Sequence, residues 1–395
     1  MDQKKNDCPT VGVIGGGQLA QMLAKAGKKH GVNVIVQTGS SKDPAGNYAY
    51  DLVLSHTQDI KGTRQLSDHC NSITFENEWL DIEGLSLLEE DGVFFVPNLS
   101  AISPLVNKLS QRKLIDRLHI PGPKWISLST LKLDDFILPD KWTFPLMAKS
   151  SIGGYDGKGT KIINDYNDLK KLLLEVNHEN WFLEQWVSYI KELSLVISRS
   201  TDGVVKSFPL TETIQDRQIC DWVLAPADVN HAVKALAYNL GVSLVRELNY
   251  VGVLAIEFFW GESGLLVNEI APRTHNSAHF TIEGCKSSQF EHQILIAAGL
   301  PVPSTDLISP GAIMVNLLGY SDNNNPNNSI DNRLNQLSEI SGLNIHWYDK
   351  QNNAPGRKLG HVTMLLKAKD CIARKQEAIN AVQKIRSIWP NEINS

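Results

Sequence analysis

Residues 145–163 read Pro-Leu-Met-Ala-Lys-Ser-Ser-Ile-Gly-Gly-Tyr-Asp-Gly-Lys-Gly-Thr-Lys-Ile-Ile, and this stretch decides the fold class. Its apolar ends predict two strands, the first ending at Lys149. Four glycines within residues 153–159 form a loop that can fold over a polyphosphate and present backbone amides to it. The loop lacks the Gly-Lys-Ser/Thr ending of a Walker A motif, and Lys149 would supply a point charge for phosphate oxygens. The alternative is a flexible hairpin with a snorkelling lysine.

A second pair of strands carries two glutamates in apolar surroundings. Residues 254–259 and 265–270 flank a Gly-Glu-Ser-Gly turn, which predicts a β-hairpin. Desolvating both Glu257 and Glu269 is costly unless a cation compensates them. Mg²⁺ takes oxygen ligands and bridges carboxylates to ATP phosphates, and Asn268 adds a neutral oxygen. We therefore expect both glutamates to bind Mg²⁺, whereas the alternative places either one at a solvated hairpin edge.

The stretch at residues 182–187 indicates where an adenine would bind. Backbone groups of the strand at 182–185 would hydrogen-bond the base, and Trp186 and Val187 would lie against its faces. Glu192 follows in the next strand and would accept hydrogen bonds from ribose hydroxyls. Taken singly, each of these residues is more simply explained by a structural role.

The N-terminal Gly15-Gly16-Gly17-Gln18-Leu19-Ala20 follows an apolar run and precedes a helical pattern. Such a turn offers backbone N–H groups and a helix N-terminus to a phosphate. A dinucleotide site also needs an acidic residue after the second strand, where this chain has Gln37-Thr38-Gly39. An NAD or FAD site is therefore disfavoured. Glycines that only permit tight packing, and a site for another phosphate-bearing ligand, remain as interpretations, and we favour the second.

Polar side chains cluster after the hairpin and again near the C-terminus. Arg273, His275 and Asn276 follow the second hairpin strand, at a position where ligand-binding loops concentrate. The C-terminal cluster is basic and consists of Lys350, Arg357 and Lys358. Such a run is usually a solvated face, but in a net-acidic chain it is also a candidate for holding a phosphate.

Composition excludes several classes of function. The chain has 395 residues and a formal net charge of −5, so no basic excess indicates nucleic-acid binding. The five cysteines are widely spaced without a Cys-x-x-Cys pair, which argues against a disulfide framework or a zinc site and fits a reducing cytoplasm. No apolar stretch is long enough for a membrane span or a signal peptide. A cytoplasmic location without membrane contact is expected.

Alternating strand and helix patterns predict an α/β protein with a parallel N-terminal sheet. A helix is expected at 18–30, and another at 102–119 with Ser103-Pro104 as its start. The strands expected in the first 190 residues are 11–14, 32–36, 51–54, 72–75, 93–96, 124–128, 146–149, 161–163 and 182–185, with a helix after Asn164.

The domain division expected from this pattern has three parts. Residues 1–107 form the first domain, and residues 108–300 form the second, with a small lobe at about 124–190. Residues 301–395 form a small C-terminal domain. Its Asn-rich stretch at 321–332 has almost no apolar content and is expected to be a surface loop.

These motifs follow the order of the ATP-grasp superfamily, and within it the chain resembles the 5-(carboxyamino)imidazole ribonucleotide synthase family, also called the phosphoribosylaminoimidazole carboxylase ATPase subunit. The resemblance begins with Gly-Gly-Gly-Gln-Leu, Lys149 with its glycine loop, and Tyr250-Val-Gly-Val-Leu-Ala-Ile-Glu257. Its specific motifs are Asn268-Glu-Ile-Ala-Pro-Arg-Thr-His-Asn-Ser-Ala-His279 and Pro355-Gly-Arg-Lys-Leu-Gly-His361. The resemblance spans nearly the whole chain and implies three lobes: a Rossmann-like pre-ATP-grasp domain, a two-lobed ATP-grasp domain and a C-terminal domain.

The resemblance also implies an activity and the residues that perform it. The reaction carboxylates 5-aminoimidazole ribonucleotide with bicarbonate and ATP through carboxyphosphate, in purine biosynthesis, with two Mg²⁺ ions or Mn²⁺ as a substitute. The implied ATP contacts are Lys108, Lys149, Gly154, Tyr155, Asp156, Gly157, Lys158, Gly159, Thr160, Glu184, Gln185, Trp186, Val187, Glu192, Gln215, Asn268 and Glu269. The implied ribonucleotide contacts are Gly17, Gln18, Leu19, Glu76, Lys350, Arg357 and Lys358. The implied catalytic residues, around bicarbonate and the reacting amine, are Tyr155, Asp156, Lys158, Arg273, His275 and Asn276, and the metal ligands are Glu257 and Glu269.

The chain departs from the family pattern at a few positions. Thr274 and Ala278 stand where Pro and Gly are usual, and Gln215 stands where some relatives have a histidine near ATP. The Asn-rich stretch resembles an insertion. We expect these departures to leave the activity intact and to alter details of the bicarbonate pocket.

Other functions remain as alternatives at this stage. Formate-dependent glycinamide ribonucleotide transformylase and biotin carboxylase are also ATP-grasp enzymes. A non-catalytic nucleotide-binding regulator would have no need for a metal-bridging pair of glutamates, and a dehydrogenase would need the missing ribose-binding acid. The resemblance further implies a homodimer and leaves open a coupling to the mutase that follows in the pathway.

Overall fold

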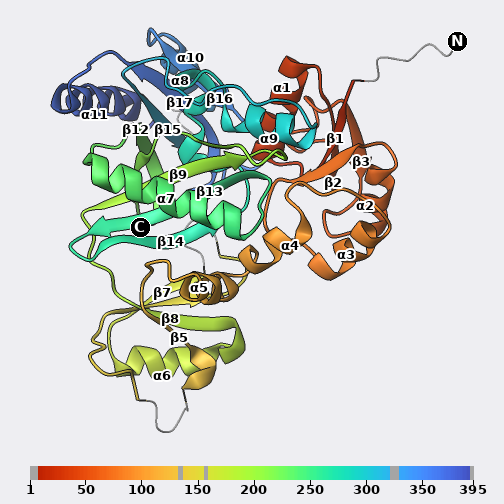
Figure 1. Ribbon diagram of the computed structural model, residues 1–395. Helices are drawn as coiled ribbons and strands as arrows, with labels where there is room; N and C mark the ends of the chain where they lie inside the picture. The colour runs from red at the N-terminus through yellow and green to blue at the C-terminus, as the bar shows by residue number, and fades with distance from the viewer. Residues whose placement is uncertain (1–7, 132–136, 155–158, 321–328, 392–395) are drawn as a thin grey trace, which may run out of the picture.

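The computed structural model describes residues 8–131, 137–154, 159–320 and 329–391. Within these ranges the chain forms an N-terminal parallel sheet, a small antiparallel sheet and a large antiparallel central sheet. Figure 1 shows the N-terminal sheet and the small sheet as separate bodies packed beside the central sheet. The candidate site residues lie where these bodies meet.

The N-terminal sheet is parallel and has the strand order β3-β2-β1-β4. Helix α1 ends at Gly31, whose φ of 68° suits a glycine C-cap. The first four predicted strands and the first predicted helix are confirmed, with end shifts of one or two residues. The elements are β1 (Thr10–Ile14), α1 (Gln18–His30), β2 (Asn33–Thr38), β3 (Asp51–Leu54), α2 (Ile60–Ser67), β4 (Ser72–Phe75) and α3 (Ile82–Glu90).

The strand predicted at residues 93–96 is wrong. Only a single parallel bridge, between Ile73 and Phe95, joins this segment to the sheet. Pro97, which has no N–H for a ladder, ends the segment, and Phe95 instead stacks on Phe75 at a ring-centroid distance of 5.7 Å. The apolar run is a core-filling segment, so hydrophobicity alone misidentified it.

The single helix predicted at 102–119 is also wrong, because the chain breaks it into short pieces. These are α4 (Leu99–Ile102), the 3₁₀ turn η1 (Ser103–Leu105) and α5 (Lys108–Arg117). The side chain of Asn107 accepts hydrogen bonds from the N–H groups of Leu109 and Ser110 and starts α5. Ser103-Pro104 therefore lies in a connecting turn, and the new start places Lys108 on the first turn of a separate helix.

The small sheet has the strand order β5-β8-β6-β7. Leucines of helix α6 pack on its inner face, in a cluster that also contains Leu146 and Leu183. The predicted strands are confirmed here within one residue at most ends. The elements are β5 (Trp125–Ser127), η2 (Leu128–Thr130), β6 (Leu146–Ser150), β7 (Thr160–Ile163), α6 (Tyr166–Glu175), η3 (His178–Asn180) and β8 (Trp181–Gln185).

The central sheet has the order β14-β13-β9-β11-β12-β15-β17-β16, with β10 paired to β9. It is continuous across residue 300, so the second and third expected domains share one sheet. Its strands are β9 (Lys191–Arg199), β10 (Val205–Ser207), β11 (Thr211–Asp216), β12 (Ile219–Ala225), β13 (Gly252–Gly261), β14 (Gly264–Ala271), β15 (Gly311–Leu318), β16 (Leu343–Trp347) and β17 (Lys358–Leu366). The helices with it are α7 (His231–Glu247), η4 (Asn276–Ala278), α8 (Thr281–Gly284), α9 (Gln289–Ala297), α10 (Ile330–Ser338) and α11 (Cys371–Ile388).

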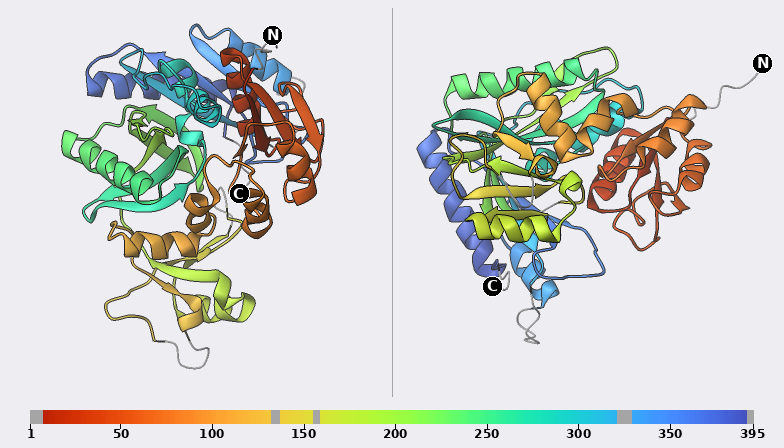
Figure 2. Two further views of the ribbon diagram at one scale, coloured as in Figure 1. Left: turned by 45° about the vertical axis from the view of Figure 1, so that its right-hand side comes forward. Right: turned by 90° about the horizontal axis from the view of Figure 1, so that it is seen from below.

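The N-terminal sheet and the central sheet are joined by a shared apolar core. Side chains of α1 and α9 belong to one buried cluster, and the two helices lie side by side in Figures 1 and 2. The buried Ser72 hydroxyl donates to the carbonyl of Ala297 at 2.7 Å, which links β4 to α9. Beyond the carboxyl end of β4, Glu78 pairs with Arg273 of the segment after β14, so the end of the parallel sheet where ligands usually bind also meets the central sheet.

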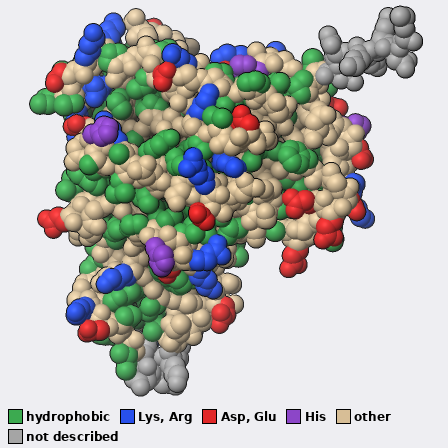
Figure 3. All heavy atoms as spheres, viewed as in Figure 1, with side chains coloured by type: hydrophobic (Ala, Val, Ile, Leu, Met, Phe, Trp, Pro, Cys, Tyr) green, Lys and Arg blue, Asp and Glu red, His purple; other side chains and the backbone are tan. Residues whose placement is uncertain are grey.

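The surface carries no single dominant charge on the face in Figure 3. Acidic side chains gather over α2 and α3, and basic side chains are scattered among neutral ones. Among the described residues, no helix combines the length and apolar character needed to cross a bilayer.

Candidate active site

The two glutamates predicted to bind metal face one another across the β13–β14 hairpin. Glu257 lies directly opposite Glu269 in the strand register, and a bulge follows Glu257. Directly opposite residues share one face of a sheet, so both carboxylates point to the same side. Each side chain keeps 30% of its surface exposed. The predicted hairpin is confirmed, and its register brings the two glutamates together.

The basic side chains near Glu257 and Glu269 do not fully neutralise the negative charge of the two carboxylates. Lys108 Nζ donates to Glu269 Oε2 at 2.9 Å, and His275 Nε2 lies 3.4 Å from Glu257 Oε1. Lost hydration, together with the charge of Glu269, raises the pKa of Glu257 to about 7. Burial lowers the pKa of Lys108, but the charge and hydrogen bond of Glu269, together with the charges of Glu257 and Glu78, outweigh it and the pKa is raised. A pair of carboxylates with surplus negative charge is suited to a divalent cation.

Lys149, at the end of β6, belongs to a buried network. Its Nζ donates to Asn268 Oδ1 at 3.0 Å and lies 2.7 Å from Glu184 Oε2. Arg112 Nε donates to the other carboxylate oxygen of Glu184. The two terminal nitrogens of Arg112 donate to the carbonyls of Val267, at 2.9 Å, and Asn268, at 2.6 Å. Sequence reasoning missed Arg112, although its i, i+4 spacing from Lys108 on one helix face was a signal.

A small cavity of about 10 Å³ lies where these groups meet, with room for roughly one water. It joins residues from α5, from the small sheet and from β14. Four of the predicted ATP contacts, which are distant in sequence, line this cavity together: Lys108, Lys149, Asn268 and Glu269. We call this junction of α5, the small sheet and β14 the seam. The lining residues are Lys108, Gln111, Arg112, Lys149, Phe182, Asn268 and Glu269.

Glu192 of β9 is held by two side chains. Tyr189 Oη donates to Glu192 Oε1 at 2.6 Å, and Gln215 Nε2 donates to Oε2 at 2.9 Å. The Tyr189 ring stacks on Phe259 of the hairpin, with centroids 4.7 Å apart. Tyr189 was not anticipated, because a tyrosine in a loop carries no spacing signal. Just past β8 the Trp186 ring is 43% exposed, which suits a surface on which a base stacks.

The glycine loop after Lys149 is described only at its two ends. Ser150 N donates to the carbonyl of Gly159 at 2.8 Å, which closes the loop at its base beside Gly154. Thr160 Oγ1 donates to Gln218 Oε1 at 2.9 Å. The predicted contacts at residues 155–158, namely Tyr155, Asp156, Gly157 and Lys158, lie outside the described residues.

The N-terminal glycine turn already holds a carboxylate. Glu76 accepts from the N–H of Gly17 at 2.6 Å and from the N–H of Leu19 at 3.1 Å. A Cβ on Gly15 would lie 2.6 Å from the Glu76 Cβ, and Gly15 has a φ of 117°. Burial raises the pKa of Glu76 against the opposing effect of these amides. Two of the amides expected to hold a phosphate are thus paired with Glu76, and the adjacent Gln18 side chain is partly exposed.

Arg273 is paired with a residue that the sequence did not indicate. Its Nε donates to Glu78 Oε2 at 2.5 Å and its Nη2 to Oε1 at 3.1 Å, a two-pronged contact between segments 195 residues apart. Burial opposes ionisation of Glu78, but the guanidinium outweighs it and lowers the pKa to about 2. Arg273 is therefore fixed beside the carboxyl end of β4 instead of projecting alone.

His275 and Asn276 are also fixed by partners. His275 Nδ1 lies 2.9 Å from Ser277 Oγ, which leaves Nε2 directed at Glu257. Asn276 and the buried Asn316 exchange amide hydrogen bonds of 2.9 and 2.8 Å. Asn316 lies in β15, 40 residues away, and no motif pointed to it. His275 therefore faces Glu257 of the hairpin, and Asn276 faces β15 of the central sheet.

The C-terminal basic residues approach the same region from β17 and the loop before it. Lys350 Nζ donates to the carbonyl of Lys358 at 2.7 Å, and the Lys350 charge lowers the pKa of Glu76 against the effect of burial. The charge of Lys358 acts on Glu257 in the same sense. Arg357 is exposed. The tertiary structure thus brings Lys350 toward Glu76 at the glycine turn and Lys358 toward Glu257 of the carboxylate pair.

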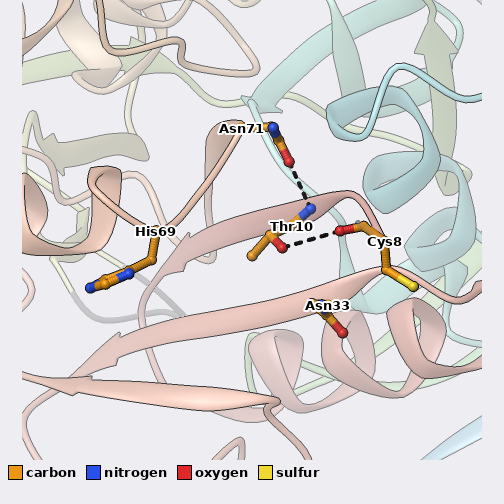
Figure 4. A pocket seen from close by; sticks show the side chains of 5 residues that line it. All are labelled: Cys8, Thr10, Asn33, His69 and Asn71. Atoms are coloured by element: carbon orange, nitrogen blue, oxygen red, sulfur yellow. Dashed lines mark hydrogen bonds between the residues drawn. The ribbon is translucent and has the colours of Figure 1, made fainter. Parts of the chain in front are cut away.

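A larger cavity, of about 290 Å³, lies at the other end of the N-terminal sheet (Figure 4). Figure 4 shows the lining residues at the starts of the strands, where Thr10 donates hydrogen bonds to the Asn71 side chain and to the Cys8 carbonyl. Ligands of parallel sheets bind at the opposite, carboxyl ends of the strands. We therefore place the functional site at the hairpin and not in this cavity.

Comparison with known proteins identifies the family of the chain. A model of the ribonucleotide synthetase preATP-grasp domain matches residues 8–104, the ATP-grasp domain matches 113–290, and the phosphoribosylaminoimidazole carboxylase C-terminal domain matches 312–375. The N5-carboxyaminoimidazole ribonucleotide synthase of Synechococcus elongatus is 40% identical over 381 residues, which cover 96% of this chain and 95% of that protein. The chain belongs to the N5-carboxyaminoimidazole ribonucleotide synthase family. The Bacillus subtilis member is 34% identical, over 96% of this chain and 95% of its own length.

Solved structures of N5-carboxyaminoimidazole ribonucleotide synthases share the fold. An ADP complex superposes with a TM-score of 0.84 at 29% identity, over 97% of this chain and 98% of that chain. An enzyme from Aspergillus clavatus, in complex with ADP and 5-aminoimidazole ribonucleotide, gives a TM-score of 0.83 at 28% identity, over 96% of this chain and 99% of that chain. The predicted ATP-grasp fold class and the predicted family are confirmed.

Proposed function

We propose that the protein carboxylates 5-aminoimidazole ribonucleotide with bicarbonate, consuming ATP and releasing ADP and phosphate, in purine biosynthesis. The observation that carries this proposal is the convergence of Glu257, Glu269, Lys108 and Lys149 at one seam. A carboxylate pair beside two cations is the arrangement that a metal–triphosphate complex requires. The relatives named above are N5-carboxyaminoimidazole ribonucleotide synthases, and this chain aligns with nearly their whole length.

Mg²⁺ fits the residues at this seam. Glu257 and Glu269 offer oxygen ligands, and the raised pKa of Glu257 reflects lost hydration and the charge of Glu269, both of which a divalent cation would offset. Among the described residues no group of three or more metal-ligating side chains occurs, so most of the coordination would come from nucleotide oxygens and water. When bound, Mg²⁺ or Mn²⁺ neutralises phosphate charge. Two ions per site, as the family resemblance implies, are part of this proposal.

Lys149 and Lys108 would hold the nucleotide phosphates, and Trp186 and Glu192 would hold its base and ribose. The terminal phosphoryl group passes from ATP to a bicarbonate oxygen, which gives ADP and carboxyphosphate. Positive charge preorganised at the seam stabilises the phosphoryl group in transit. The glycine loop would close over the site and exclude water, which would otherwise hydrolyse the intermediate.

The bond between the carboxyl carbon and the phosphate oxygen of carboxyphosphate then breaks, phosphate leaves, and the carboxyl group is transferred to the exocyclic amine of the ribonucleotide. His275, with Nε2 directed at the hairpin, is a candidate acceptor for the amine proton. Asp156 of the glycine loop is the other candidate. Glu76, at the glycine turn, would bind ribose hydroxyls, and the ribonucleotide phosphate would be held by Lys350, Arg357 and Lys358.

The remaining parts of the proposal concern organisation. We assign residues 1–107, 108–300 and 301–395 to the three domains and expect a homodimer, and direct transfer of product to the following mutase would be consistent with a labile carbamate. The five cysteines are free thiols, which supports a reducing, cytoplasmic environment.

ADP release tests the function directly. It is measured with bicarbonate and 5-aminoimidazole ribonucleotide, and in parallel with glycinamide ribonucleotide plus formate and with biotin plus bicarbonate. The proposal requires release that depends on 5-aminoimidazole ribonucleotide. Release stimulated only by another acceptor would assign a different ATP-grasp reaction, and release with no acceptor dependence would leave a simple ATPase.

A further inference from the structure

Arg112 has no role in the mechanism above, yet it is among the most buried cationic side chains of the described residues. Its side chain is 4% exposed and that of its partner Glu184 is 3% exposed. Burying an ion pair of this kind is costly, and it persists where further hydrogen bonds satisfy both groups. Arg112 meets that condition because all three of its nitrogen atoms have acceptors.

The charges around Glu184 form a row of three. Arg112 contacts one carboxylate oxygen of Glu184 and Lys149 contacts the other. The row carries a net charge of +1, and Lys149 lies at its open end beside Asn268. Without Arg112 the row would be neutral, because Glu184 would pair with Lys149 alone. A buried carboxylate would then oppose any phosphate that approaches Lys149.

The same guanidinium also holds the hairpin strand. Its donors to the Val267 and Asn268 carbonyls fix the backbone just before Glu269. Asn268 in turn accepts from Lys149, so one side chain connects α5, the small sheet and β14. A lysine could keep the charge at this position but has one donor nitrogen where arginine presents a planar fork.

We propose that Arg112 is a positioning residue that keeps Lys149 available to nucleotide phosphates, with Glu184 as its anchor and not as a nucleotide ligand through its carboxylate. This inference rests on the proposed nucleotide site but not on the identity of the carboxyl acceptor. Lys149 touches the phosphates, and Arg112 acts only through Glu184 and the strand.

The test measures ADP and adenosine binding by calorimetry with Mg²⁺ and without ribonucleotide. Arg112→Gln is expected to raise the Kd for ADP about tenfold, equivalent to the loss of one well-placed charge, and the Kd for adenosine less than about twofold. The double variant Arg112→Gln with Glu184→Gln restores the net charge of +1 through Lys149. It is expected to bind ADP within about threefold of the unmodified protein.

Controls separate this role from a purely structural one. Arg374→Gln removes another buried arginine, whose Nη1 donates to the Lys369 carbonyl at 3.0 Å, and should leave ADP binding unchanged. Arg112→Lys should retain most ADP affinity. If Arg112→Gln does not fold, the ADP affinities of Arg112→Lys and of the double variant, each compared with the unmodified protein, test the proposal instead. Equal losses for ADP and adenosine, or a double variant that binds ADP no better than Arg112→Gln, would overturn the proposal. ADP binding does not depend on the acceptor, so a failed carboxylation assay leaves this test readable.

Discussion

Replacing Glu257 by glutamine should stabilise the protein at alkaline pH while it abolishes turnover. In the folded protein, desolvation and the opposing Glu269 raise the Glu257 pKa from an ordinary 4.5 to about 7. The folded state therefore holds a proton between pH 4.5 and 7 that the unfolded state lacks, so stability rises as pH falls through 7. Above pH 7 the ionised Glu257 destabilises the fold, and glutamine removes that effect.

The magnitude follows from the two pKa values. At about 1.4 kcal/mol for each pH unit, the difference between 4.5 and about 7 sets an upper bound of about 3 kcal/mol. Solvent screening of a side chain that is 30% exposed reduces this to about 1–3 kcal/mol. For a chain of 395 residues the corresponding rise in Tm is about 1–4 °C at pH 8.5.

The assay is thermal unfolding of both proteins at pH 8.5 and at pH 5, without nucleotide and with a metal chelator. Glu257→Gln should have the higher Tm at pH 8.5, and the gain should shrink to about a quarter at pH 5, which lies above the ordinary value of 4.5 but below the folded pKa. Glu262→Gln, at the exposed hairpin turn, is the matched control and should show no such difference. A Tm for Glu257→Gln that is equal to or below that of the unmodified protein at pH 8.5 would refute the reasoning.

Three further predictions address the other parts of the site. Glu269→Gln should lower ATP turnover at least about 100-fold with an unchanged circular dichroism spectrum, because it removes a metal ligand, and normal turnover would remove that assignment. Arg357→Ala should raise the KM for the ribonucleotide about tenfold with little change in the KM for ATP, and an unchanged value would place the phosphate elsewhere. Gly15→Ala should lower stability by about 2–4 kcal/mol in a denaturation experiment, because its Cβ would collide with Glu76 at a positive φ; a neutral effect would contradict the close packing of this turn.

The hairpin shows why part of the site was predictable. Strand side chains alternate with a period of two, and a short turn sets the register of the two strands. The spacing about the Gly-Glu-Ser-Gly turn alone would pair Glu257 with Asn268, and the bulge after Glu257 shifts the register so that Glu257 lies opposite Glu269. The same local logic found α1 and the strands around the glycine loop.

The wrongly predicted strand at 93–96 and the broken helix at 102–119 show where this logic stops. In both cases a locally acceptable pattern was overruled by a tertiary contact or a stronger cap, namely the packing of Phe95 on Phe75 and the capping of α5 by Asn107. Propensity is a weak prior, and packing routinely overrides it.

The sequence by itself determined the fold class, the family and the hairpin that carries both glutamates, because strand and turn signals are local and the family motifs can be matched in order along the chain. Only the tertiary structure decided which charge pairs with which: Arg112 with Glu184, Arg273 with Glu78, and Glu76 with the amides of the glycine turn. These partners lie 57 to 195 residues apart. Coulomb energy depends on distance and burial in space, and spacing along the chain carries no information about either.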